Sequence, residues 1–156
     1  EILSLPILGT LNLHAGTLPA YRGGSPLNWQ IINGETAGTA YILKMTPYID
    51  DGPIYAQQRY FIEPSDDATS ITTKVNQIFR TLLPDTVSRF LSGEFPKSKT
   101  QNAHGAITWT KRQPDDGIIH WNQLKSHEVI NLVRGLTHPY PGAYTFFDQY
   151  KLTIHN

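Results

Sequence analysis

The sequence predicts an α/β domain, and three observations point to that class. Apolar and polar residues alternate with a period of two over 11–14, and β-rich runs follow at 39–46 and 54–62. Beyond them, residues 71–83 carry apolar side chains at spacings of three and four, as in a helix that covers a sheet. The 156-residue chain has no Cys. Its core must therefore form without disulfides or a thiolate zinc site.

Charge and hydropathy exclude several classes of protein. The chain carries 13 Lys and Arg against 13 Asp and Glu, with a pI near 7.3, so a nucleic-acid partner is disfavoured. No apolar run approaches the roughly 18 residues of a membrane helix, and no segment resembles a signal peptide. We therefore expect a cytoplasmic protein with no membrane partner.

The first strand, at 11–14, places Asn12 and His14 on one face because side chains alternate along a strand. The Gly- and Pro-rich stretch 15–26 predicts a long loop at the end of that strand. Pro26 suits the first position of a short helix that runs to Ile32. The strands 39–46 and 54–62 follow, separated by a tight loop at 47–53.

Two helices and a hairpin complete the prediction. The first helix begins near Thr69, and Pro84 predicts a kink or break before a second stretch that ends at Gly93. Residues 97–117 predict a connecting segment around a short strand at 107–109. Another helix is expected after Ser126, and a hairpin over 143–155.

Asn12, His14 and Asp50 form the group most suited to chemistry. In an open sheet, loops splay apart at the strands' carboxyl ends, so the three side chains can converge there. An amide can donate to an oxyanion, an imidazole can move a proton, and a carboxylate can orient that imidazole. By spacing alone, capping or loop-bonding roles account for these residues as well, and Asp50, Asp51 and Gly52 also suit an ordinary turn.

The sequence around this group resembles the formyltransferases that use 10-formyltetrahydrofolate. The first matching block comprises residues 9–23, Pro26, Trp29, 33–35, 38–39 and 49–52. The second comprises 112–117, Trp121, 133–135 and 139–144. Within the family, the chain looks most similar to enzymes that formylate the amine of a nucleotide-linked sugar.

The resemblance implies a fold and a division of the chain. Residues 1–100 would be the C-terminal part of a Rossmann-like catalytic domain, 101–122 a linker, and 123–156 the start of a small, OB-like β-barrel subdomain. The chain opens at Glu1 and enters its first strand almost at once. We therefore expect an internal portion of a longer enzyme, whose parallel sheet would leave an apolar edge exposed over residues 1–14.

Carried over by matched position, the resemblance assigns roles to single residues. The catalytic group would be Asn12, His14 and Asp50, with Asp51 as the less favoured choice of carboxylate. The residues expected to bind the folate are Thr17, Leu18, Pro19, Tyr48, Ile49 and Asp51. Tyr21 and Arg22 are expected to bind the acceptor, although Arg22 can equally brace its loop through backbone carbonyls.

The implied activity is transfer of a formyl group from 10-formyltetrahydrofolate to a primary amine, with no metal. Asn12 and protonated His14 would donate to the tetrahedral oxyanion while Asp50 holds His14. The acceptor is expected to be a nucleotide-linked amino sugar. Methionyl-tRNA formylation, 10-formyltetrahydrofolate hydrolysis and an inactive binding module remain as alternatives, and homo-oligomerisation stays open.

Overall fold

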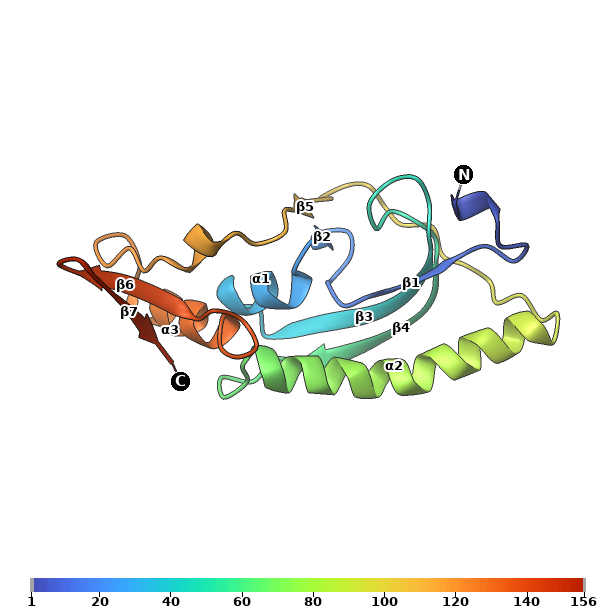
Figure 1. Cartoon of the computed structure of the whole chain (residues 1–156). Helices are drawn as coiled ribbons and strands as arrows, with labels where there is room; N and C mark the ends of the chain where they lie inside the picture. The colour runs from blue at the N-terminus through green and yellow to red at the C-terminus, as the bar shows by residue number, and fades with distance from the viewer. Residues whose placement is uncertain (1, 156) are drawn as a thin grey trace.

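The computed structural model describes residues 2–155 and contains seven short strands, three α-helices and two 3-10 helices in that range. In chain order they are η1 Ile2–Ser4, β1 Leu11–His14, β2 Arg22–Gly23, α1 Pro26–Ile32, β3 Ala37–Lys44, β4 Ile54–Phe61, α2 Ala68–Leu91, β5 Thr108–Trp109, η2 Pro114–Gly117, α3 Ser126–Gly135, β6 Ala143–Phe147 and β7 Tyr150–Ile154. This order confirms the predicted α/β class (Figure 1).

The central sheet is three-stranded, in the order β1-β3-β4, and both pairings are antiparallel. The register sets Asn12 opposite Leu43 and His14 opposite Tyr41. The expectation of a parallel sheet around β1 is therefore wrong for the strands that the structure describes. The turn between β3 and β4 is short, which suits antiparallel neighbours, whereas a parallel pair needs a crossover of a dozen or more residues.

Helix α2 lies along one side of β3 and β4 (Figure 1). It begins at a capping box in which Asp67 and Ser70 each accept from the other's backbone N–H. Its buried face packs into the main core, which consists of Ile31, Ala40, Tyr60, Ile62, Ala68, Ile71, Val75 and Ile78.

Of the kink or break predicted at Pro84, the break does not occur: α2 continues through Pro84 to Leu91. Proline removes one backbone hydrogen bond and crowds the preceding turn. Pro84 itself is exposed, and the buried apolar residues of α2 in the main core, among them Ile71, Val75 and Ile78, all lie before it.

A second core joins α3 to the C-terminal hairpin. Its buried members are Ile119, Leu132, Val133, Leu136 and Ala143. The amide of Asn28 donates to the Gly135 carbonyl at 2.7 Å, which ties α1 to the end of α3. Of the expected β-barrel, the described residues contain the hairpin β6-β7, in which Ala143 pairs with Ile154. The division at 100 and 122 stays a prediction.

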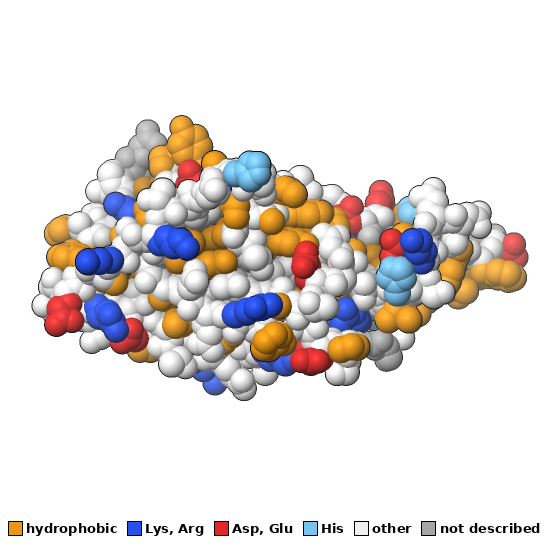
Figure 2. Space-filling view, turned by 180° about the vertical axis from the view of Figure 1, so that it is seen from behind, with side chains coloured by type: hydrophobic (Ala, Val, Ile, Leu, Met, Phe, Trp, Pro, Cys, Tyr) orange, Lys and Arg blue, Asp and Glu red, His pale blue; other side chains and the backbone are white. Residues whose placement is uncertain are grey.

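The surface bears on two expectations: an exposed apolar edge over residues 1–14, and a chain with neither a nucleic-acid nor a membrane partner. The stretch before β1 exposes Ile2, Leu5, Ile7 and Leu8, and Leu13 within the strand is 42% exposed. Figure 2 shows Lys and Arg side chains scattered over the face in view rather than gathered into a stripe. Among the helices described, none is long and apolar enough to cross a membrane.

Candidate active site

The structure brings Asn12, His14 and Asp50 together. Asn12 and His14 project from β1, and Asp50 lies in the loop between β3 and β4. Nδ2 of Asn12 donates to Oδ1 of Asp50 at 2.7 Å, and Nδ1 of His14 lies 3.4 Å from Oδ2. The backbone N–H of Gly23 donates to the same Oδ2 at 2.8 Å. The Asp50 carboxylate is therefore held from both sides.

A glutamine outside the predicted set fixes the backbone that carries Asp50. Nε2 of Gln101 donates to the carbonyls of Asp50 and Gly52, both at 2.8 Å. This matters because Asp50 has a φ of 48°, a left-handed conformation that is uncommon for a residue with a side chain. Oε1 of Gln101 in turn accepts from Nη2 of Arg22 at 2.7 Å. Arg22 and Gln101 thus brace the loop of the carboxylate.

His14 is buried, with 5% of its surface exposed. Its Nε2 lies 2.7 Å from the carbonyl oxygen of Tyr21. Because a carbonyl only accepts, Nε2 carries a proton and donates it there. In the neutral ring, Nδ1 then presents a lone pair toward Asp50.

Burial lowers the pKa of His14 below its ordinary value of 6.5, since desolvation disfavours the imidazolium. The charge of Asp50 and the carbonyl of Tyr21 act in the opposite direction, and the charge of Arg22 adds to the lowering. The balance favours a neutral imidazole that can take up a proton at Nδ1, where Asp50 stabilises the resulting charge.

Gly16 permits the contact between His14 and Tyr21. A Cβ at this position would lie 2.5 Å from the carbonyl oxygen of Tyr21 and 2.8 Å from Nε2 of His14. Both distances are far below ordinary contact, so the loop approaches the imidazole this closely only with glycine at 16.

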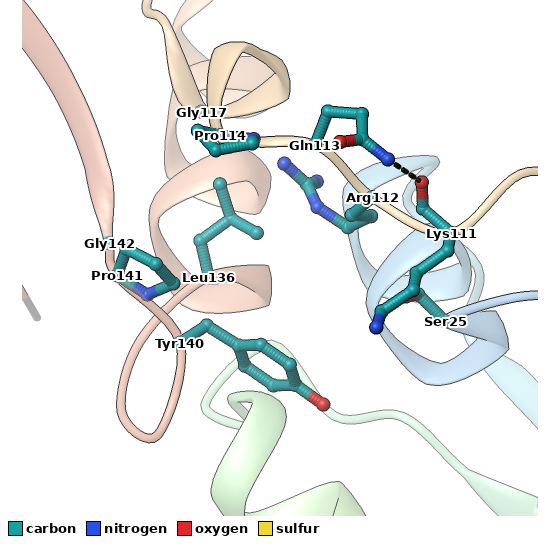
Figure 3. A pocket seen from close by; sticks show the side chains of 10 residues that line it. All are labelled: Ser25, Lys111, Arg112, Gln113, Pro114, Gly117, Leu136, Tyr140, Pro141 and Gly142. Carbon is teal, nitrogen blue, oxygen red and sulfur yellow. Dashed lines mark hydrogen bonds between the residues drawn. The ribbon is translucent and has the colours of Figure 1, made fainter.

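Two neighbouring cavities lie at this site. The first, of about 320 Å³, is lined by Asn12, His14 and Asp50, and Ser25 and Tyr140 also belong to its lining. The second, of about 200 Å³, shares Ser25 and Tyr140 and is completed by residues 111–114 and 117, together with Leu136, Pro141 and Gly142 (Figure 3). A ligand that lies across Ser25 and Tyr140 can occupy both cavities.

The expected folate residues do not all face the same space. Leu18 and Pro19 line a separate cavity of about 340 Å³ that also includes Gln101. Tyr48 and Ile49 are 75% and 61% exposed next to Asp50. Thr17 is turned inward, since its N–H and its hydroxyl both donate to Oε1 of Gln30 at 3.1 Å.

Asp51 is separated from the imidazole by its own hydrogen bond. Its carboxylate accepts from the hydroxyl of Thr46, within the loop. Asp50 accepts from Asn12 and faces His14. The geometry therefore favours Asp50 over Asp51 as the partner of the imidazole.

Neither residue expected to bind the acceptor presents its side chain to the cavity of Asn12, His14 and Asp50. The hydroxyl of Tyr21 donates to Oε1 of Glu35 at 2.7 Å, and burial raises the pKa of Tyr21 to about 12. Its ring stacks on Trp109 with centroids 5.6 Å apart. Arg22 braces its loop, as one alternative held, but through the amide of Gln101 rather than backbone carbonyls.

No cluster of three or more His, Cys, Asp or Glu residues suited to a metal ion occurs between residues 2 and 155. The groups at the site are a fixed carboxylate, a neutral imidazole and an amide with one N–H still available beyond the Asp50 bond. This set can stabilise an oxyanion and accept a proton.

Two family models match the chain. Residues 1–87 match "Formyl transferase", and residues 111–156 match "Formyl transferase, C-terminal domain". Asn12, His14 and Asp50 lie within the first match, and Arg112 and Tyr140 lie within the second.

Solved structures share the fold. The methionyl-tRNA formyltransferase from Clostridium thermocellum is 22% identical with a TM-score of 0.79, over 94% of this chain and 61% of that chain. The N-formyltransferase from Helicobacter canadensis, in complex with folinic acid and dTDP-3-aminofucose, is 16% identical with a TM-score of 0.72, over 93% and 62%.

HypX from Aquifex aeolicus, in complex with tetrahydrofolic acid, is 21% identical with a TM-score of 0.68, over 94% of this chain and 25% of that chain. The present chain spans less than two thirds of the length of each of these three proteins. The N-terminal family model matches more than half of the sequence, and the C-terminal model matches the chain from residue 111 onward. The chain belongs to the formyl transferase family.

Proposed function

We propose that the protein transfers a formyl group from 10-formyltetrahydrofolate to a primary amine, and that Asn12, His14 and Asp50 carry out the reaction. One observation carries the proposal. A single carboxylate, that of Asp50, accepts from Asn12 and Gly23 and faces the buried His14 imidazole at 3.4 Å. Folding of the antiparallel sheet does not require these three side chains to lie together.

Asn12 is suited to the oxyanion. One N–H of its amide is used by Asp50, and the second is available to the carbonyl oxygen of the formyl group as negative charge develops there. The bond to Asp50 fixes the amide before the reaction, so no reorganisation is needed. A donor placed in this way contributes on the order of 3 kcal/mol to transition-state stabilisation.

His14 and Asp50 are suited to the proton. The attacking amine must lose a proton, and Nδ1 of the neutral imidazole can accept it next to Asp50. The same proton can then pass to N10 of the folate as the bond between N10 and the formyl carbon breaks. The expectation that His14 donates to the oxyanion receives less support, because its Nε2 proton is already bound by the Tyr21 carbonyl. Asn12 is therefore the oxyanion donor that the geometry favours.

The formyl donor requires a flat, largely apolar surface near Asp50. Tyr48 and Ile49 expose apolar area directly before Asp50 in the sequence, and Met45 is 40% exposed at the start of the same loop. Packing a heteroaromatic ring there would remove that area from water. These residues fit the folate, which supplies the activated formyl carbon when bound.

The acceptor that we propose is the amine of a nucleotide-linked sugar. The Helicobacter canadensis relative was solved with dTDP-3-aminofucose, and a net charge of zero disfavours tRNA. A methionyl-tRNA formyltransferase has the same fold, so methionyl-tRNA is the second candidate acceptor.

The intact protein should be incubated with 10-formyltetrahydrofolate and a panel of amino-sugar nucleotides, and the products analysed by mass. The proposal predicts a gain of one formyl group on an amine acceptor and little formate without one. Equal formate release with and without every amine would indicate a hydrolase. Formylation of methionyl-tRNA alone would move the acceptor to the tRNA class. Near wild-type rates in Asn12→Ala, His14→Ala and Asp50→Ala would contradict the catalytic assignment.

A further inference from the structure

The second cavity, of about 200 Å³, lies between the segment 111–117 and the end of α3 (Figure 3). Among the described residues that line it, Lys111 and Arg112 are the charged ones, and none is Asp or Glu. Leu136, Pro141 and Tyr140 supply an apolar wall. A low-dielectric wall strengthens the attraction that two cations exert on an anion.

Arg112 has unused binding capacity. Its Nη1 is a buried nitrogen with no hydrogen-bond partner among the described residues. A buried N–H without a partner costs about 1–3 kcal/mol, and more for a charged group. The guanidinium lies over the ring of Trp29, 5.0 Å from its centroid, and this contact fixes its plane.

The surroundings of Arg112 do not neutralise it. Asp116 and Tyr140 lie near enough to raise its pKa, yet burial is the larger effect and lowers it. Oδ2 of Asp116 accepts from the backbone N–H of Gln113 at 2.6 Å rather than from the guanidinium. The side chain of Gln113 donates to the Lys111 carbonyl at 3.2 Å, which orders the short segment that carries both cations.

We propose that this cavity binds the diphosphate of the acceptor, with Arg112 and Lys111 as its donors. A guanidinium presents paired N–H donors that match two oxygens of a phosphate, while an ammonium acts as a point charge. A neutral oxygen can also accept from Nη1 of Arg112, but it forms a weaker bond with the guanidinium than a phosphate oxygen does.

The position of the cavity fits this role. Ser25 and Tyr140 line both this cavity and the one that holds Asn12, His14 and Asp50. An acceptor with its amine in the first cavity can therefore place its anionic part in the second. This inference rests on the proposed function for the identity of the ligand as an acceptor, but not for the presence of an anion site.

The test is equilibrium binding of dTDP, inorganic pyrophosphate and thymidine to the intact protein by calorimetry, without a formyl donor. We expect Arg112→Gln to weaken dTDP and pyrophosphate binding at least about tenfold and Lys111→Gln about fivefold, because charge-assisted bonds to phosphate are lost. Arg112→Lys should recover part of the affinity. Lys97→Gln, an exposed substitution of the same kind outside the cavity, should stay within about twofold of wild type.

Unchanged dTDP affinity in Lys111→Gln and in folded Arg112→Gln would overturn the proposal, and the Lys111 variant keeps the test valid if Arg112→Gln does not fold. Weakened thymidine binding alone would assign the cavity to the base and contradict it. Because no formyl donor is present, failure here is distinct from failure of the proposed reaction, which the formylation assay measures.

Discussion

Asp50→Asn is the substitution that separates the carboxylate's charge from its shape. The native carboxylate accepts from Nδ2 of Asn12 at 2.7 Å and from the N–H of Gly23 at 2.8 Å. An amide of the same size has one acceptor oxygen, so it can keep only one of these bonds, and its NH₂ group must face a donor on the other side. It also removes the charge that faces His14 at 3.4 Å.

The expected loss follows from these contacts. A hydrogen bond to a charged group contributes roughly 1.5–3 kcal/mol, and each 1.36 kcal/mol changes a rate about tenfold. Loss of one bond and of the charge behind the imidazole predicts a fall of about 10²–10⁴-fold in kcat/KM, the range for general acid–base groups. The acceptor KM should change much less, because Asp50 acts on the proton and the amide rather than on ground-state binding.

The assay is single-turnover formyl transfer by the intact protein, with Asp51→Asn as the matched comparison. Asp51 is the adjacent carboxylate, and it is bonded to Thr46 instead of facing His14. The fold-decrease in kcat/KM for Asp51→Asn should be less than a tenth of that for Asp50→Asn. A rate for Asp50→Asn within about threefold of wild type, or an equal loss in both variants, would refute the reasoning.

Three further predictions follow from the same contacts. Gln101→Ala removes the hydrogen bonds that hold the left-handed Asp50 loop. We therefore expect kcat to fall about tenfold and the pH–rate profile to shift, with partial recovery in Gln101→Asn. An unchanged pH–rate profile would mean that Gln101 has a structural role alone. Burial lowers the pKa of His14 below 6.5, so the unfolded chain binds the proton more readily than the folded one. The free energy of unfolding should therefore fall as the pH drops below 6.5, and urea titrations should show a shallower fall for His14→Gln. Gly16→Ala places a methyl group 2.5 Å from the Tyr21 carbonyl and should cost about 1–3 kcal/mol of unfolding free energy by denaturant titration, whereas Gly105→Ala, with open space around it, should lose stability through backbone strain alone.

Part of this site could be predicted from the sequence because strand geometry is regular. A period of two places Asn12 and His14 on one face wherever 11–14 is a strand. The α/β class and the helix over 69–83 came from equally regular patterns. Asp50 is different, since its place beside Asn12 depends on a loop. Its position after a strand makes it a candidate, and the family resemblance favours it over Asp51.

The remaining parts of the site have no periodic signal. The N–H of Gly23 and the carbonyl of Tyr21 are backbone groups that any residue could supply, and Gln101 lies in an extended segment with no regular structure. The continuation of α2 through Pro84 escaped prediction for a physical reason as well. Tertiary packing of the buried face over 71–78 stabilises the helix, and an exposed proline near its end weakens it without ending it.

Formyl transfer to an amine is tested most directly with 10-formyltetrahydrofolate labelled with ¹³C in the formyl carbon. The intact protein, the labelled donor and an amino-sugar nucleotide would be mixed in a single turnover and the acceptor mass recorded. We predict one labelled formyl group on the acceptor in the wild type, and almost none in Asp50→Asn over the same interval. An unmodified acceptor, with labelled formate released at the same rate whether or not the amine is present, would contradict the account.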